Sequence, residues 1–185
     1  MTRSRGLGDV YKRQTHSNAH ALATAVQAHL EEIPIDAAVE QHLADLQHGG
    51  DFDVVFENAQ ARERTQILFN YANKVGGIVV GTGDLSELAL GWCTFNADHM
   101  ANYNVNASVP KTLIAYLVRW YAQHRAGAHP QLGDMLQRVL DTPISPELIP
   151  PQNDEISQLT ESLVGPYELH AVSYTHLTLP TSSRV

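Results

Sequence analysis

The stretch that decides the fold runs from Gly76 to Trp92: Gly76-Gly77-Ile78-Val79-Val80-Gly81-Thr82-Gly83-Asp84-Leu85-Ser86-Glu87-Leu88-Ala89-Leu90-Gly91-Trp92. Its glycine-bounded, β-branched run predicts a strand over 77–81, of the kind that is buried on both faces of a parallel sheet. A short helix over 84–90 is expected to follow. Because ligands bind where parallel strands end, this carboxyl edge is the first candidate site.

Polar groups gather at that edge. Thr82 offers a hydroxyl, and Gly83 lets a ligand approach the backbone. Asp84 and Glu87 are three residues apart, so a helix places both carboxylates on one face, which suits a hard cation such as Mg²⁺. The alternative is a capping box, in which Asp84 caps the helix and Glu87 answers it; the local pattern alone favours capping.

Composition limits the class of protein. With 185 residues, 43% of them hydrophobic, the chain can form one globular domain or a piece of one. It has no apolar run of about 18 residues, so no membrane span is expected, and its basic start lacks the apolar stretch of a secretory signal. The net charge of -8 argues against nucleic-acid binding.

Cysteine and histidine usage adds two further expectations. Cys93 is the single cysteine, which excludes an internal disulfide, fits a reducing cytoplasm and indicates a buried, inert thiol. The ten histidines show no His-x-His or His-Glu-x-x-His spacing, so most are predicted to be surface or capping residues.

The two ends differ from the middle of the chain. Residues 1–14 and 172–185 show neither helical periodicity nor capping residues, and both resemble translated sequencing adapters. We therefore expect foreign, disordered ends around a partial domain at 15–171, which would be a fragment cut at both ends.

Between these ends, apolar spacing predicts alternating helices and strands. Helical stripes are expected at Leu22, Val26, His29 and Leu30, at Val39, Leu43 and Leu46, over 57–75 with Gly76 as its cap, from Pro110 to Arg125, and over 132–140. The segment 33–35 is a possible short edge strand, and Gly49-Gly50-Asp51 marks a turn. Helices of this length between strands indicate an α/β fold with a doubly wound parallel sheet.

Two further positions point to an anion. Asn58 and Arg62 share a helix face, where an arginine fork can hold a carboxylate or a phosphate, although a solvated face with ordinary ion pairs is the simpler alternative. Lys111 lies in the first turn after Pro110, where a cation is unfavourable for the helix dipole unless an anion also binds there.

Five ordered segments closely resemble the synthetase domain of glutamine-dependent NAD+ synthetases: 56–65, 81–92, 103–106, 109–113 and 164–170. The resemblance covers nearly all of residues 15–170. It implies a Rossmann-like fold of the adenine-nucleotide α-hydrolase type, here truncated at both ends.

The resemblance also implies a reaction. ATP adenylates the nicotinate carboxylate of deamido-NAD+ with release of pyrophosphate, and ammonia then displaces AMP, with no covalent nucleophile from the protein. By similarity, the ATP site includes Thr82, Lys111 and Thr142, Glu87 ligates Mg²⁺, and deamido-NAD+ contacts Asn58, Arg62, Trp92 and Asp98. Ammonia would come from a glutaminase domain of the parent chain, which is expected to be a cytoplasmic homo-oligomer.

The chain departs from the family in three ways. The Ser-Gly-Gly-x-Asp-Ser pyrophosphate loop does not occur, and Gly49-Gly50-Asp51 cannot replace it. The amidase domain and the lysine that closes over deamido-NAD+ are also absent, so this chain itself is expected to be inactive. Two alternatives remain open: another ATP-pyrophosphatase-type ligase of the same fold, or a non-catalytic interaction fragment with exposed apolar faces.

Overall fold

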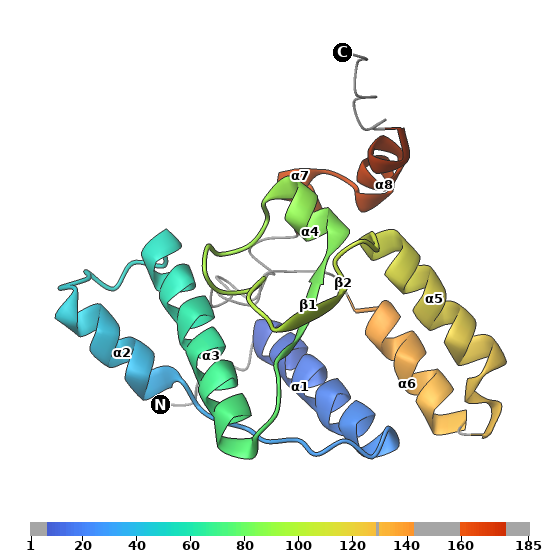
Figure 1. Ribbon diagram of the computed structural model, residues 1–185, viewed down its shortest axis with the longest axis horizontal. Coiled ribbons are helices and arrows are strands. Elements are labelled where there is room, and N and C mark those ends of the chain that lie inside the picture. Colours follow the sequence, from blue (N-terminus) through green and yellow to red (C-terminus); the bar gives the residue numbers. More distant parts are fainter. Residues whose placement is uncertain (1–6, 129, 143–159, 177–185) are drawn as a thin grey trace, which may run out of the picture.

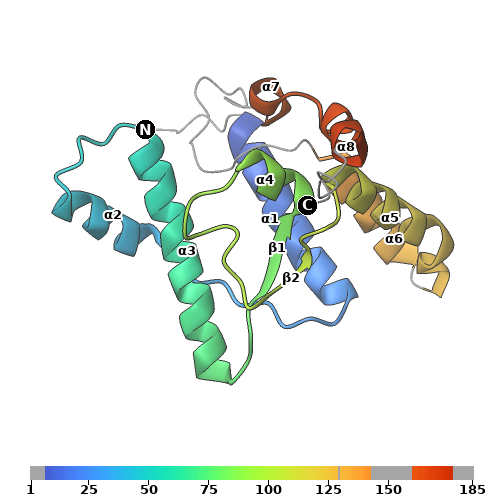
Figure 2. The same cartoon turned by 45° about the horizontal axis from the view of Figure 1, so that its top comes forward.

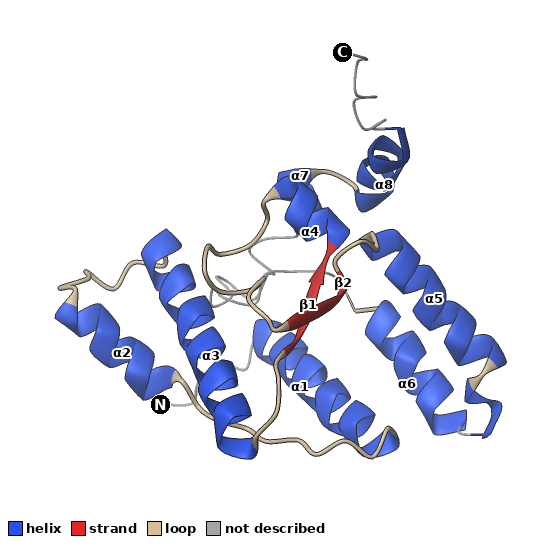
Figure 3. Cartoon of the chain, in the orientation of Figure 1, coloured by secondary structure: helices blue, strands red, loops and turns tan. Residues whose placement is uncertain are grey.

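Two parallel strands form the centre of the molecule. The computed structural model describes residues 7–128, 130–142 and 160–176. Strands β1 (Val80–Asp84) and β2 (Tyr103–Asn106) pair in parallel, which confirms the predicted strand direction. Helices flank this small sheet, with α2 and α3 on one side and α5 and α6 on the other (Figures 1 and 2), and Figure 3 shows how largely helical the described chain is.

The helices largely follow the expected positions. They are α1 (Leu7–Ala25), α2 (Asp36–Asp45), α3 (Val54–Val75), α4 (Leu85–Leu90), α5 (Lys111–His124), the 3-10 turn η1 (Ala126–Ala128), α6 (Pro130–Leu140), α7 (Thr160–Val164) and α8 (Tyr167–His176). Helix α3 begins three residues earlier than expected because Asp53 caps the backbone N–H groups of Val55 and Phe56. It ends as predicted at Gly76, whose φ of 69° is the left-handed conformation of a C-terminal cap.

The strand at the deciding stretch differs from the prediction in position and burial. It begins at Val80 rather than at Gly77 and continues to Asp84. Burial on both faces is wrong for this chain: Val79 is buried, but Ile78 is 65% exposed and Val80 54% exposed. Among the described residues β1 pairs with β2 alone, and Ile78 and Val80 face an open hollow beside α3.

Strand β2 lies in a stretch for which no strand was predicted. Its pairing with β1 brings Gly81 opposite Asn104. A Cβ atom at Gly81 would lie 1.8 Å from Asn104 Oδ1 and 2.7 Å from Ala101 Cβ. A glycine is therefore required at this point for the two strands to come together.

Two predictions for the first part of the chain are wrong. The edge strand expected at 33–35 does not form, because Pro34 lacks an N–H donor and the described residues offer no strand beside it. The helical stripe predicted from Leu22 to Leu30 also extends beyond the end of α1. Helix α1 ends at Ala25, and Gln27, with φ of 56°, turns the chain away while Ala28 N donates to Ala23 O.

Helix α1 begins at Leu7, so residues 7–14 are helical although their sequence shows no helical period. Whether they and the other end are foreign to the natural protein stays a prediction.

The core is built mainly from small side chains, which lets the helices pack closely. Among the residues whose burial the structure describes, the buried apolar ones are Val39, Ala59, Ala61, Ala72, Val79, Ala97, Ala126, Leu132, Met135 and Tyr167. Many larger apolar side chains on α3, β1 and α5 stay exposed. None of the described helices combines the length and the apolar character needed to cross a membrane.

Candidate functional site

A lysine held by two carboxylates lies where β1 ends. Lys111 Nζ is 2.7 Å from Asp84 Oδ2 and 2.9 Å from Glu87 Oε1. The backbone N–H of Lys111 donates to the buried hydroxyl of Ser86 at 3.1 Å. These contacts join the beginning of α5 to the beginning of α4, so the two elements predicted to carry the site do meet.

The same carboxylates form the capping box favoured by the local pattern. Asp84 Oδ1 accepts from the backbone N–H of Glu87 at 3.1 Å, and Glu87 Oε2 accepts from the backbone N–H of Asp84 at 3.2 Å. Each carboxylate therefore uses one oxygen for the cap and the other for Lys111. Because the Asp84 side chain is only 3% exposed, the ammonium of Lys111 supplies the partner that a buried carboxylate needs.

The local electrostatics keep Lys111 charged. Burial acts to lower the pKa of Lys111, but the hydrogen bonds with Asp84 and Glu87 outweigh it and raise that pKa above its ordinary value. The ring of Tyr167, at the start of α8, lies 5.5 Å from Lys111 Nζ and adds a cation–π contact. Tyr167 belongs to one of the resembling segments, but its contact with Lys111 was not anticipated.

A second feature is a hollow of about 370 Å³ between α3 and the loop that follows α4. Its lining includes all four residues predicted to contact deamido-NAD+: Asn58, Arg62, Trp92 and Asp98. Asn58 and Arg62 thus share one face of α3 as expected. The structure brings these four side chains together, while their role as ligand contacts stays a prediction.

Hydrogen bonds hold the walls of this hollow. Thr94 Oγ1 donates to Asn58 Oδ1 at 2.8 Å, and its backbone N–H donates to Asp98 Oδ2 at 3.0 Å. Arg62 Nε donates to the Phe95 carbonyl at 3.3 Å. Cys93 also lines the hollow and is only partly buried, so the expected full burial of its thiol is wrong. Burial, followed by the negative charges of Asp98 and Glu87, raises the pKa of this thiol, which disfavours the reactive thiolate.

No described hydrogen bond or ion pair joins the other two predicted ATP contacts, Thr82 and Thr142, to Lys111. Thr82 is exposed on β1 and lines a hollow of about 580 Å³ whose described lining includes Asp98 but neither Glu87 nor Lys111. Thr142 follows α6, where its hydroxyl donates to the Arg138 carbonyl at 2.8 Å. The described contacts thus unite Glu87 with Lys111, and leave Thr82 and Thr142 separate.

The residues at the Lys111 cluster fit a magnesium ion by their chemistry. Glu87 Oε1 has a spare lone pair beside its contact with Lys111, and its side chain is partly exposed. Carboxylate oxygens are the ligands that Mg²⁺ takes from proteins, usually one or two of them with phosphate oxygens and water.

The parallel strands, the polar turn at their carboxyl edge and the lysine beyond it define an α/β protein whose candidate ligand site lies at that edge. The sequence model of the NAD synthase family matches residues 8–167. The chain therefore belongs to the NAD synthase family. The match includes residues 8–14, which lie in the segment expected to be foreign.

Two curated relatives support this membership. The chain is 49% identical over 166 residues to the glutamine-dependent NAD(+) synthetase of Mycobacterium bovis, a match that covers 86% of this chain and 24% of that protein. The Mycobacterium leprae protein of the same name is 46% identical over 172 residues, which cover 90% of this chain and 25% of that protein. The chain thus spans about a quarter of the length of these curated relatives.

Solved structures agree with the fold. The glutamine-dependent NAD+ synthetase of Acinetobacter baumannii in complex with ADP superposes with a TM-score of 0.60 at 27% identity, covering 67% of this chain and 24% of that one. NMN synthetase from Francisella tularensis gives a TM-score of 0.69 at 23% identity, covering 91% of this chain and 63% of that one, and supports the fold alone. The expected adenine-nucleotide α-hydrolase fold is confirmed.

Proposed function

We propose that this chain supplies part of the site in which an NAD+ synthetase adenylates deamido-NAD+ with ATP and then amidates it with ammonia. The observation that carries the proposal is the hollow between α3 and the loop after α4, because it gathers Asn58, Arg62, Trp92 and Asp98 from two distant parts of the chain. Family membership adds the class of reaction.

The dinucleotide half of the proposed site combines a cation with a flat apolar surface. The guanidinium of Arg62 can pair with a phosphate or carboxylate oxygen, and the amide of Asn58 can both donate and accept. The Trp92 indole, 38% exposed, offers a face on which a ring can stack.

The proposed ATP half centres on Lys111. Its permanent charge would neutralise phosphate oxygens and the charge that develops on departing pyrophosphate. Glu87 would ligate Mg²⁺, which supplies further charge neutralisation when bound. Asp84 would act as a positioning residue, since its buried carboxylate fixes where Lys111 Nζ lies. Thr82 and Thr142 stay proposed as ATP contacts from the resemblance alone.

The whole activity requires more than these residues. We propose that glutamine, hydrolysed by a glutaminase domain of the parent chain, supplies the ammonia, and that the parent is a cytoplasmic homo-oligomer. The 185 residues contain no Ser-Gly-Gly-x-Asp-Ser loop, so we expect this chain alone to bind substrate without turnover.

Calorimetric titration of the chain with deamido-NAD+ tests the proposal. We expect measurable binding that Arg62→Ala or Trp92→Ala weakens about tenfold, a loss of about 1.4 kcal/mol. Arg119→Ala and Trp120→Ala on α5 are matched controls, because Trp120 is 40% exposed and neither residue lines the hollow; they should leave binding unchanged.

The alternatives give different results. A different ligase of this fold would prefer another carboxylate over deamido-NAD+, and a pure interaction fragment would bind neither deamido-NAD+ nor ATP with Mg²⁺. Submicromolar ATP binding together with NAD+ formation by the isolated chain would overturn the expected inactivity.

A further inference from the structure

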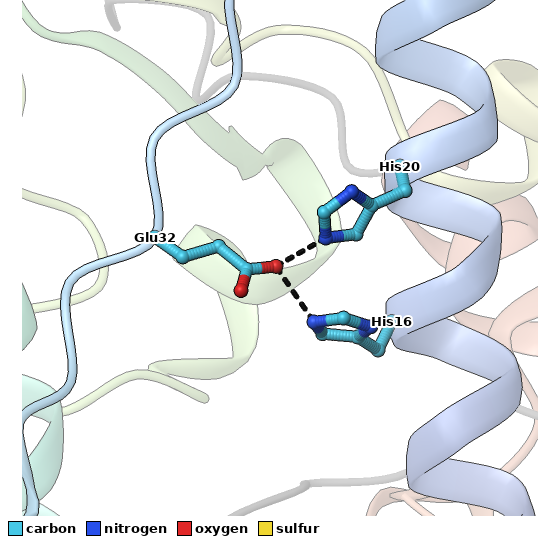
Figure 4. Close-up of side chains that lie close together, drawn as sticks. All are labelled: His16, His20 and Glu32. Atoms are coloured by element: carbon cyan, nitrogen blue, oxygen red, sulfur yellow. Dashed lines mark hydrogen bonds and ion pairs between the residues drawn. The ribbon is translucent and has the colours of Figure 1, made fainter.

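Two histidines and a glutamate converge on the surface between α1 and the segment that leads to α2 (Figure 4). His16 and His20 lie one turn apart on α1, and Glu32 lies in the irregular segment 28–35. Glu32 Oε1 is 2.6 Å from His16 Nε2 and also pairs with His20 Nε2. The three potential ligand atoms all lie within 4.8 Å of one another.

We propose that this cluster, the His16–His20–Glu32 site, binds a zinc ion. Residues four apart on a helix share a face, which is why both imidazoles can point to one place. Imidazole nitrogen and carboxylate oxygen are standard zinc ligands, and two histidines with one glutamate leave the fourth tetrahedral position to water.

The present geometry needs only a small adjustment for a metal. Ligands about 2.0–2.1 Å from a tetrahedral zinc ion lie about 3.3 Å from one another. Glu32 Oε1 would therefore withdraw by about 0.7 Å from His16 Nε2 as the metal replaces the shared hydrogen bonds. The side chains of His16, His20 and Glu32 are 61%, 48% and 55% exposed, so they are free to move and water can reach the fourth position.

Metal binding would have a structural consequence. Helix α1 packs against α6, whereas the segment 28–35 leads away to α2, which packs against α3. A zinc ion at the His16–His20–Glu32 site would tie the start of this connection to α1. Since the ion would bind the folded arrangement of three separated residues, it would stabilise the folded chain.

The test uses the full 185-residue chain, stripped with EDTA and dialysed. Titration with ZnCl₂ should show one site, and Co²⁺ used as a spectroscopic substitute should give the absorption of a four-coordinate ion. Loss of an outer partner of a metal ligand already costs about 10–100-fold in affinity, so His20→Ala and Glu32→Gln should each weaken zinc binding at least about tenfold. His29→Ala is the matched control, because His29 pairs with Glu31 alone at 3.2 Å.

A measurement on the unaltered chain avoids dependence on how the variants fold. The ring signals of two histidines should shift first as zinc is added in an NMR titration, and they should be those that His16 and His20 variants remove. No zinc binding by the unaltered chain, first shifts at other histidines, or an equal loss in His29→Ala would each overturn the proposal and leave a metal-free His–Glu–His cluster.

Discussion

At the scale of single residues, Lys111 connects the fold to the proposed chemistry. Its ammonium neutralises the buried carboxylate of Asp84 and contacts Glu87 and the Tyr167 ring. One side chain of α5 thereby links two parts of the chain that are distant in sequence, namely the junction of β1 with α4 and the start of α8. The same charge that would attract phosphate is thus also needed for the local structure.

Lys111→Met should therefore lower stability as well as ATP binding. Removing one partner of a buried ion pair leaves the other charge uncompensated, and we expect a loss of about 2–3 kcal/mol in the free energy of unfolding, because Lys111 retains some solvent contact. Urea unfolding measures this loss. Lys74→Met, at an exposed position in the last turn of α3, is the control and should change stability by less than about 0.5 kcal/mol.

The difference in the free energy of unfolding between the unaltered chain and Lys111→Met should depend on pH in one direction. Since the pKa of Lys111 is raised in the folded chain, its contribution is complete below the ordinary lysine pKa of about 10.4. The contribution is lost as the pH rises through the higher folded value. The stability gap between the unaltered chain and Lys111→Met should thus be constant at pH 7–9 and narrow above pH 10.4; a gap that widened there would contradict the assignment.

At the scale of elements, α3 depends on its N-terminal cap. Asp53 Oδ1 accepts from the backbone N–H groups of Val55 and Phe56, both at 3.0 Å, and His48 Nε2 lies 3.0 Å from the same atom. The bond from Phe56 is the largest reason that the pKa of Asp53 lies below its ordinary value, with a smaller contribution from His48. The cap thus stabilises the helix that carries Asn58 and Arg62.

Asp53→Ala should lower the melting temperature at pH 7. Asp53→Asn should lower it much less, because asparagine is also a good N-cap. A lowered folded pKa gives stability that is present above the ordinary value of about 3.9 and is lost as the pH falls through the folded pKa. The difference between the unaltered chain and Asp53→Ala should therefore shrink below about pH 4 in thermal scans. Asp51→Ala, at the exposed turn before the cap, should change neither the melting temperature at pH 7 nor its dependence on pH.

Elements defined by local residues could be predicted from the sequence. The Gly76 cap of α3, the Asp84–Glu87 capping box and the start of α5 after Pro110 depend on contacts within a few residues. The grouping of Asn58 with Trp92 came from the resemblance, since spacing along the chain gives no hint of it.

Features that depend on distant contacts were missed or wrong. Strand β2 is polar and exists because Gly81 admits Asn104, and the pairing of Lys111 with Asp84 joins residues far apart in the sequence. The His16–His20–Glu32 site escaped a search for short histidine motifs because its third ligand lies on another segment. The segment 33–35 was wrongly predicted as a strand, because a strand forms only beside another strand and the local sequence pattern does not show whether such a neighbour is present.

At the scale of the whole molecule, α4 joins the two halves of the proposed site. Its capping box fixes Asp84 and Glu87 beside Lys111, and its last turn ends at Gly91 with φ of 65°. That left-handed residue turns the chain into the loop over 91–98, which lines the hollow with Asn58 and Arg62. Helix α4, which has six residues, therefore fixes where the proposed dinucleotide region lies relative to the proposed ATP region.

The molecule also presents a large apolar surface around the hollow that contains Thr82. Leu68 and Val75 of α3 and the neighbouring Ile78 and Val80 line this hollow and are all more than half exposed. Contiguous apolar patches of this kind favour association and bind hydrophobic dyes. The chain should therefore enhance the fluorescence of anilinonaphthalene sulfonate and self-associate at high concentration.

Leu68→Glu should reduce both effects by placing a charge in this patch, while the free energy of unfolding changes by less than about 0.5 kcal/mol because the position is exposed. Dye fluorescence and sedimentation velocity measure the two effects. Leu169→Glu on α8 changes an even more exposed leucine that lies outside the hollow, so it should alter neither the dye fluorescence nor the self-association. Equal losses in both variants would mean that association follows overall charge; a loss confined to Leu68→Glu would locate the associating surface between α3 and β1.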